Sequence, residues 1–141
     1  MPTVLIVDDH AAVRTAVRER FETSFLASVV CGEAENGADA ILKAQKLKPD
    51  LIVLNLSMPV MDGFEAAKAL RRLFPGIQIV MLTAHYMETT KQVAILAGIT
   101  DVFSKHQDLS RLSRTHAPYS VCVARPILLP LSRSFARREA T

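Results

Sequence analysis

The sequence comprises 141 residues and 15.5 kDa, which is the size of a single ordinary domain. Hydrophobic residues make up 50% of the chain and charged residues 22%, so it can bury one core, and a mostly disordered protein is excluded. The two cysteines, Cys31 and Cys122, lie far apart without CxxC spacing, which argues against a disulfide-stabilised mini-protein and a metal–thiolate site. Without a basic-apolar leader or an apolar run long enough to span a bilayer, we expect a cytoplasmic protein.

The net charge of +3 is unevenly distributed along the chain. Residues 106–141 carry six arginines against Asp108 and Glu139, a net of +4, whereas residues 1–105 carry 11 basic and 12 acidic side chains, a net of −1. The basic character therefore belongs to the C-terminal segment. A solvated tail explains it at least as well as contact with nucleic acid does.

Short apolar runs alternate with helical patterns from the first residues onward. Five runs have the composition of strands buried on both faces: 4–7, 27–31, 51–54, 77–82 and 102–104. Apolar residues recur at helical spacing between them: in 13–21, in 40–44 after an N-cap at Asn36, in 64–74 and in 86–97. This alternation predicts parallel strands joined by right-handed crossovers, and hence a three-layer α/β sandwich.

Polar side chains follow the predicted strands where each one ends. Asp8 and Asp9 follow the first strand, Asn55 ends the third, Thr83 follows the fourth and Lys105 follows the fifth. Because functional groups collect at the carboxyl ends of parallel strands, we expect these five side chains at one edge of the sheet.

The pattern changes after Lys105. A fifth helix is expected there, but residues 106–115 offer only one or two turns, and prolines 118, 126 and 130 follow. We therefore divide the chain into a body, 1–105, and a segment 106–141 with a short or irregular fifth helix and a basic, proline-containing tail. Truncation or a frame shift would explain this change. Thirty-six residues are also too few for a DNA-binding module with its own core, so nucleic acid is not an expected partner.

Residues 3–105 resemble the receiver domain of bacterial two-component response regulators, including the chemotaxis response regulators. The resemblance is carried by Val4–Val7 followed by two aspartates, by Met58-Pro59-Val60-Met61-Asp62-Gly63, by Thr83-Ala84 and by Lys105. It implies a flavodoxin-like, doubly wound sheet of five parallel strands in the order 2-1-3-4-5. It also implies signal transduction in a phosphorelay rather than an enzyme, with a histidine kinase or a phosphotransfer protein as partner.

The resemblance assigns roles to individual residues. Asp9 would be a direct Mg²⁺ ligand, Asp8 would act largely through water, and the Ser57 carbonyl would complete the metal site. Lys105 would pair with a phosphoryl oxygen, and Thr83 would be the switch residue that hydrogen-bonds another. Oxygen ligands of this kind are those that Mg²⁺ prefers.

The phosphoacceptor position of the family holds Asn55 in this chain, where an aspartate is usual. A carboxamide oxygen is neutral and a far weaker nucleophile than a carboxylate, so the usual acyl phosphate is not expected. The lost negative charge should also weaken Mg²⁺ binding. Natural divergence and an engineered substitution both account for Asn55, and Ser57 is an alternative acceptor.

Two further positions depart from the family pattern. The aromatic switch residue is usually three residues before the lysine, where this chain has Val102, and Phe103 should point to the opposite face of the sheet. His106 stands where the family usually has proline after a cis bond. A cis bond before His106 would cost about 2.5–4 kcal/mol, so we expect it to be trans.

Other interpretations stay open at this stage. The chain could be a phosphorylation-independent adaptor (a pseudo-receiver), with a homodimer formed through the face of the fourth helix and fifth strand or through the tail. An enzyme on this fold lacks support, because no Ser/Thr-rich phosphate loop or phosphatase-type pair of aspartates follows the first strand. Taken singly, Asp8-Asp9 could cap a helix, Asn55 could bind backbone and Lys105 could be solvated.

Overall fold

The computed structural model describes residues 2–23 and 28–105. Strands and helices alternate along them without exception. The strands are β1 (Thr3–Val7), β2 (Val29–Ala34), β3 (Leu51–Asn55), β4 (Gln78–Thr83) and β5 (Asp101–Ser104). The helices are α1 (Ala11–Glu22), α2 (Gly37–Leu47), α3 (Gly63–Leu73) and α4 (Glu88–Leu96).

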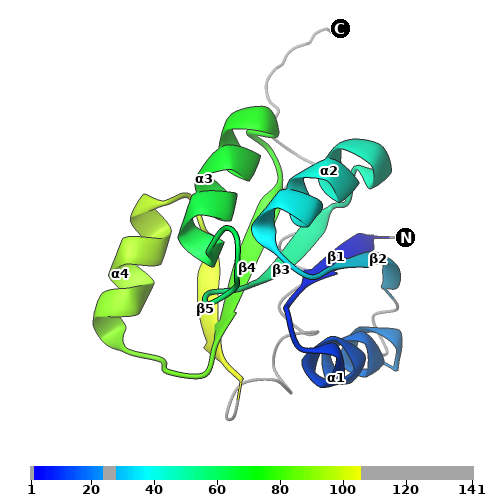
Figure 1. Cartoon of the computed structure of the whole chain (residues 1–141), viewed down its shortest axis with the longest axis horizontal. Coiled ribbons are helices and arrows are strands. Elements are labelled where there is room, and N and C mark those ends of the chain that lie inside the picture. The colour runs from blue at the N-terminus through cyan, green and yellow to red at the C-terminus, as the bar shows by residue number, and fades with distance from the viewer. Residues whose placement is uncertain (1, 24–27, 106–141) are drawn as a thin grey trace, which may run out of the picture.

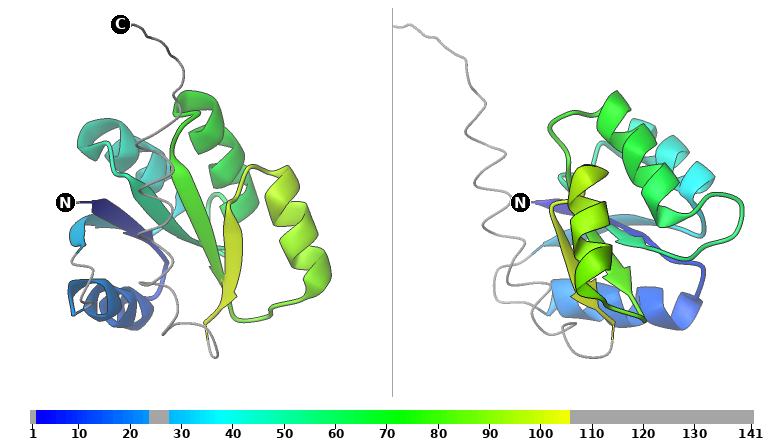
Figure 2. Two further views of the ribbon diagram at one scale, coloured as in Figure 1. Left: turned by 180° about the vertical axis from the view of Figure 1, so that it is seen from behind. Right: turned by 90° about the vertical axis from the view of Figure 1, so that its left-hand side faces the viewer.

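The five strands form one parallel sheet in the order β2-β1-β3-β4-β5. Helix α1 lies on one face of this sheet, and α2, α3 and α4 lie on the other (Figures 1 and 2). The flavodoxin-like order predicted from the sequence is therefore confirmed. Because all strands run the same way, their carboxyl ends meet at a single edge.

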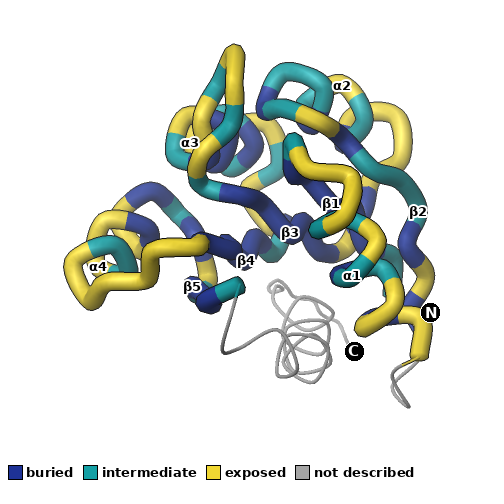
Figure 3. Tube along the Cα trace, turned by 60° about the horizontal axis from the view of Figure 1, so that its bottom comes forward, coloured by how far each residue is buried: buried dark blue, intermediate teal, exposed yellow. Residues whose placement is uncertain are grey.

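Strand alternation divides the apolar residues into two cores. On β3, Ile52 and Leu54 pack with α2 and α3, whereas Leu51 and Val53 pack with the buried residues of α1. The central strands β3 and β4 are buried along almost their whole lengths (Figure 3). Such continuous apolar runs are expected of strands covered on both faces.

The two central residues of β5 fall on opposite faces of the sheet. Val102 belongs to the core beneath α2–α4, and Phe103 belongs to the core beneath α1. The prediction that Phe103 faces away from Val102 is confirmed. Phe103 is fully buried at 2% exposure, so in this chain it is a core residue.

Some predicted boundaries were wrong. The second strand was predicted at 27–31, but β2 runs from Val29 to Ala34, because backbone pairing with β1 continues past the polar stretch Gly32-Glu33. The helix predicted from residue 86 begins at Glu88, since the amide of His85 instead donates to the Thr83 hydroxyl in a turn. The fifth helix, the tail and the peptide bond before His106 lie outside the described residues.

Capping interactions mark the ends of several helices. The Asn36 side chain caps α2 by accepting a hydrogen bond from the Asp39 amide at 2.9 Å, as predicted. Helix α3 begins with a capping box, in which the side chains and backbone amides of Asp62 and Glu65 bond reciprocally. Gly98, with φ of 92°, ends the α4 region. Within the described residues, no helix has the length and apolar character needed to cross a membrane.

Candidate functional site

The carboxyl edge of the sheet brings together four of the predicted side chains. Asp8 leaves β1 almost fully buried at 2% exposure, and the Asp9 side chain beside it is 27% exposed. Asn55, at the end of β3, is buried at 4% exposure, and the Lys105 side chain, which follows β5, is 14% exposed. The pocket they form is called the acidic pocket below, and it also includes the backbone carbonyl of Ser57.

The Asn55 carboxamide bridges two oxygens of the acidic pocket. Its Nδ2 donates to the Ser57 carbonyl oxygen at 2.7 Å and to Asp9 Oδ1 at 3.2 Å. Both partners can only accept hydrogen bonds, so the orientation of the amide is dictated by chemistry. The predicted hydrogen bond from Asn55 to backbone is present, and a carboxylate shares the same donor group.

Lys105 reaches from beyond β5 to the far side of the pocket. Its Nζ lies 2.9 Å from Asp8 Oδ2. Among the described residues, this oxygen has no partner in hydrogen-bond geometry, so the contact is an ion pair. The lysine amide also donates to the Thr83 carbonyl at 2.9 Å, which continues the β4–β5 pairing and directs the side chain along the edge.

Thr83 is the last residue of β4 and is 3% exposed. Its hydroxyl accepts a hydrogen bond from the His85 amide at 3.1 Å. The structure thus places Thr83 at the predicted edge, with its hydroxyl engaged in the turn that leads towards α4. A role as the switch residue stays a prediction.

His10 is a member of the pocket that the sequence analysis did not single out. Its Nδ1 lies 3.1 Å from Asp9 Oδ1 and 3.4 Å from Asp8 Oδ1, although its side chain is 68% exposed. The three side chains are close enough to share one metal ion. Their adjacency in the sequence, just before the first helix, was the available signal.

Two hydrogen bonds between side chain and backbone hold the turn at Asp8. Asp8 Oδ1 accepts a hydrogen bond from the His10 amide at 2.8 Å, which closes a tight turn before α1. Arg14 donates to the Asp8 carbonyl at 2.6 Å, and its Nε pairs with Glu33 of β2 at 2.8 Å. Arg18 also binds Glu33, and these partners lower the pKa of Glu33 although burial opposes the shift.

A close backbone approach positions Asn55 from the other side. A Cβ at Gly63 would lie 2.4 Å from the Asn55 carbonyl oxygen and 2.9 Å from the Leu56 Cα, so only glycine fits there. The Gly63 amide donates to the Leu56 carbonyl at 2.7 Å. In the loop before it, Val60 has a φ of 72°, a strained value for a β-branched residue.

The chemistry of the pocket fits a hard divalent cation only in part. Carboxylate and carbonyl oxygens of Asp8, Asp9 and Ser57 are suitable ligands for Mg²⁺. However, the Asn55 amide directs its hydrogens at two of these oxygens, and Lys105 pairs with a third. As arranged, Asp9 Oδ1 and the Ser57 carbonyl accept hydrogen bonds from Asn55, and Asp8 Oδ2 faces the Lys105 ammonium, so positively polarised groups of the protein already approach three of the oxygens that a cation would use.

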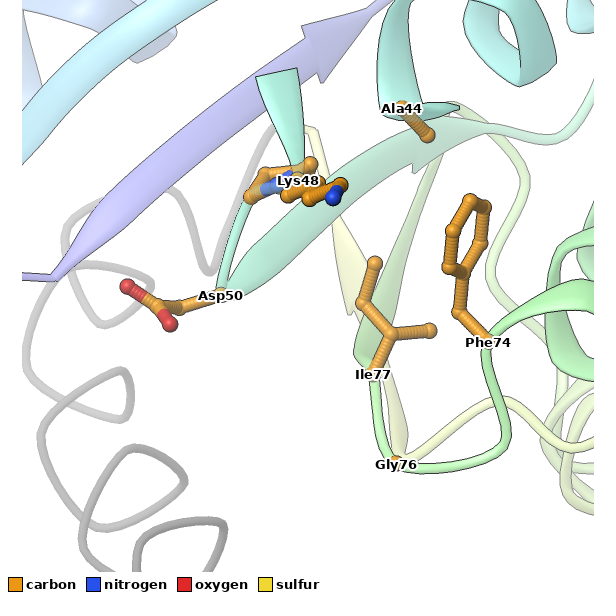
Figure 4. A pocket seen from close by; sticks show the side chains of 7 residues that line it. Ala44, Lys48, Asp50, Phe74, Gly76 and Ile77 are labelled. Atoms are coloured by element: carbon orange, nitrogen blue, oxygen red, sulfur yellow. The ribbon is translucent and has the colours of Figure 1, made fainter. Parts of the chain in front are cut away.

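A second hollow lies at the opposite edge of the sheet (Figure 4). It has a volume of about 350 Å³, and its lining is mostly apolar, with Ala44, Phe74 and Ile77 prominent. Asp50 at its rim turns away and accepts hydrogen bonds from Thr3. Lys48 and Asp50 are the charged residues of its lining, and among the described residues no cluster of polar side chains comparable with that of the acidic pocket lies there, so the acidic pocket is the candidate functional site.

Comparison with known proteins agrees with the fold. The sequence model of the response regulator receiver domain matches residues 4–116. A putative transcriptional regulator of Pseudomonas aeruginosa is 38% identical over 112 residues, which are 79% of this chain and 53% of that protein. The response regulator protein VraR of Staphylococcus saprophyticus is 35% identical over 140 residues, covering 96% of this chain and 66% of that protein. The chain therefore spans between half and two thirds of the length of these relatives.

Solved structures extend the likeness to the fold. The REC domain of AraT, a response regulator from Geobacillus stearothermophilus, has a TM-score of 0.75 at 31% identity, covering 87% of this chain and 95% of that one. The signal receiver domain of the putative response regulator NarL from Mycobacterium tuberculosis has a TM-score of 0.78 at 25% identity, covering 85% and 96%.

Proposed function

Because the chain belongs to the family of response regulator receiver domains, we propose that it is a two-component receiver whose phosphoacceptor position is occupied by Asn55. In this proposal the domain meets a histidine kinase or a phosphotransfer protein in the cytoplasm without accepting a stable phosphoryl group. Its signalling state is then set by protein binding, which biases an equilibrium between two conformations.

The observation that carries the proposal is the state of Asn55. Its side chain is buried at the carboxyl end of β3 and donates both to a carboxylate and to a carbonyl. A phosphoryl group needs a negatively charged oxygen nucleophile there, and the oxygen of an amide is neutral and a far weaker nucleophile. The neighbouring groups that would surround a phosphoryl group are nevertheless retained.

Each retained residue has a role in the proposal. Asp8 and Asp9 provide the carboxylates of the pocket, and Ser57 provides its backbone carbonyl. Lys105 provides the cation that would pair with a phosphoryl oxygen, and Thr83 provides the switch hydroxyl. Receiver domains generally bind Mg²⁺ at such a pocket, and the proposal includes a weakened Mg²⁺ affinity in this chain.

The test is intact-mass analysis after incubation with Mg²⁺ and a small phosphodonor, comparing the chain with an Asn55→Asp variant. The variant should gain one labile phosphoryl group, and the chain itself should gain none. Asn55→Asp combined with Lys105→Met serves as the matched control and should react more slowly. Phosphorylation of the unchanged chain would contradict the proposal and point to Ser57 or another acceptor. Failure of the variant would show that the pocket is no longer competent.

A second candidate function, a phosphorylation-independent adaptor, is favoured by the surface of α4. Val93, Ile95 and Leu96 are 50%, 53% and 88% exposed, which is unusual for three large apolar side chains on one short helix. Val93 and Leu96 also line a hollow against Phe64 and Lys68 of α3. A protein partner or a second copy of the chain would bury this surface.

The adaptor function predicts that Leu96→Asp weakens association without lowering stability, because this side chain contributes little to the core. Light scattering coupled to size exclusion measures self-association, and urea unfolding measures stability. Ala94→Asp, on the buried side of the same helix, is the matched control and should unfold the protein instead. The adaptor function would be contradicted if the unchanged chain is already a monomer and Leu96→Asp alters neither its mass in solution nor its binding to a protein partner.

A further inference from the structure

The acidic pocket offsets part of its negative charge without an added ion. Two carboxylates, Asp8 and Asp9, face one ammonium, that of Lys105, with the exposed imidazole of His10 beside them. An aspartate at position 55 would add a further negative charge to this cluster. The asparagine adds instead two N–H donors, and its Nδ2 donates to two acceptor oxygens of the pocket.

The positions of those contacts are specific. One acceptor is a carboxylate oxygen of Asp9 and the other is the Ser57 carbonyl oxygen, at 3.2 and 2.7 Å. These are the same two oxygens that a divalent cation would bridge, since Mg²⁺ takes carboxylate and carbonyl ligands. The Asn55 nitrogen, with its two polar hydrogens, therefore bonds the same two oxygens that a metal ion would otherwise bind.

We propose that the Asn55 amide nitrogen is a built-in substitute for the divalent cation, so that this domain keeps its acidic pocket assembled while excluding Mg²⁺. This inference rests on the proposed function, because it assumes that the pocket is that of a receiver. It identifies Asn55 as the residue that determines the pocket's cation specificity, in addition to blocking phosphorylation.

Exclusion follows from the direction of the amide dipole. Its hydrogens carry partial positive charge and point at the oxygens that a cation must approach. For Mg²⁺ to bind, the amide must rotate or withdraw, which breaks two hydrogen bonds, one of them to a charged group. The Asn55 side chain has little freedom to do so, because it is buried and its backbone is held against Gly63.

Loss of charge alone would predict a different result. If only the missing negative charge weakened Mg²⁺ binding, then Asn55→Ala, which is equally neutral, would bind Mg²⁺ no better than the unchanged chain. If the amide competes with the cation, its removal opens the site, because water can enter and turn its oxygen towards Mg²⁺. The alanine variant thus separates charge from competition.

The experiment is a Mg²⁺ titration followed by NMR, read from the backbone amides of Asp9 and Ser57. Asn55→Ala and Asn55→Ser should each bind Mg²⁺ about tenfold more tightly than the unchanged chain, as the loss of competing hydrogen bonds requires. Asn55→Asp should bind more tightly still. Asn36→Ala is the control, since Asn36 is the only other asparagine of the chain and its side chain bonds the Asp39 amide at the start of α2. Its affinity should not change.

A second measurement needs no variant to remain folded. The side-chain amide signals of Asn55 should exchange with water at least tenfold more slowly than those of Asn36, and should stay in place in millimolar Mg²⁺. Fast exchange, or alanine and serine variants that bind Mg²⁺ no better than the unchanged chain, would overturn the inference. Failure of Asn55→Asp to accept a phosphoryl group would instead contradict the proposed function, so the two outcomes are distinguishable.

Discussion

The ion pair between Lys105 and Asp8 allows a quantitative test of how the acidic pocket is held together. It joins a residue beyond β5 to the end of β1, on the other side of β4 and β3. The Asp8 carboxylate is 2% exposed and the Lys105 side chain 14% exposed, so water screens the pair only weakly. The perturbation is Lys105→Met, which keeps the length of the side chain and removes its charge.

The expected magnitude follows from the geometry. At 2.9 Å and an effective dielectric constant of about 20, the attraction between unit charges is about 6 kcal/mol. Desolvation of both groups offsets part of this attraction. Removing one partner of a buried pair leaves the other charge uncompensated and typically costs about 3–5 kcal/mol. We expect Lys105→Met to lower the free energy of unfolding by about 3 kcal/mol, since the lysine retains some contact with water.

The assay is urea unfolding followed by far-ultraviolet circular dichroism. Adding Asp8→Asn to Lys105→Met should restore at least about 1 kcal/mol, because the uncompensated charge is removed. The pair of Lys91 and Asp101, at 3.7 Å and with both side chains about a third exposed, provides the control. Lys91→Met should cost less than about 1 kcal/mol. The reasoning would be refuted if Lys105→Met also lowers the free energy of unfolding by less than about 1 kcal/mol. It would equally be refuted if the changes in free energy caused by Lys105→Met and Asp8→Asn simply add in the double variant.

Two further predictions concern the supports of the pocket. Gly63→Ala should destabilise the fold by about 1–3 kcal/mol in urea unfolding, because its Cβ would collide with the Asn55 carbonyl oxygen, whereas Gly76→Ala, which meets nothing within 4 Å, should not. A harmless Gly63→Ala would contradict this packing. Burial tends to raise the pKa of Glu33, but hydrogen bonds from Arg18 and Arg14 lower this pKa below the ordinary 4.5. Its contribution to stability should therefore be present above that pH and be lost as pH falls through the lowered pKa. The stability difference from Glu33→Gln should shrink over that range, and a pH-independent difference would rule the linkage out.

Much of the fold was predictable because its causes are local. The run Leu51–Leu54 is apolar at every position, as a strand covered on both faces must be, and Asn36 and Gly98 mark helix ends through their own side-chain and backbone chemistry. The shared edge for Asp8 and Lys105 followed from parallel strand direction alone. Strand β2 was less predictable, because Gly32 and Glu33 interrupt its apolar pattern while pairing with β1 continues.

The sequence predicted which residues lie at the site, but it did not predict how their side chains contact one another. Sequence order places His10 beside the two aspartates, but only the turn closed by Asp8 directs its imidazole towards them. In the same way, a glycine after Asp62 indicates the start of a helix. Its second role, allowing the backbone of Asn55 to approach closely, depends on tertiary packing that no local pattern contains.

Asn55 shows why membership of the family and competence for its chemistry have to be judged separately. An asparagine and an aspartate share their size and shape, so the sheet, the loop and the neighbouring ion pair form equally well around either. What differs is the polarity of one group, which donates where a carboxylate would accept. In this pocket both neighbours of that group are acceptors, so the asparagine is satisfied by the same oxygens that would bind a cation beside an aspartate. A single atom can therefore change a pocket that needs a metal ion into one that holds itself together, with no change in backbone structure to reveal it.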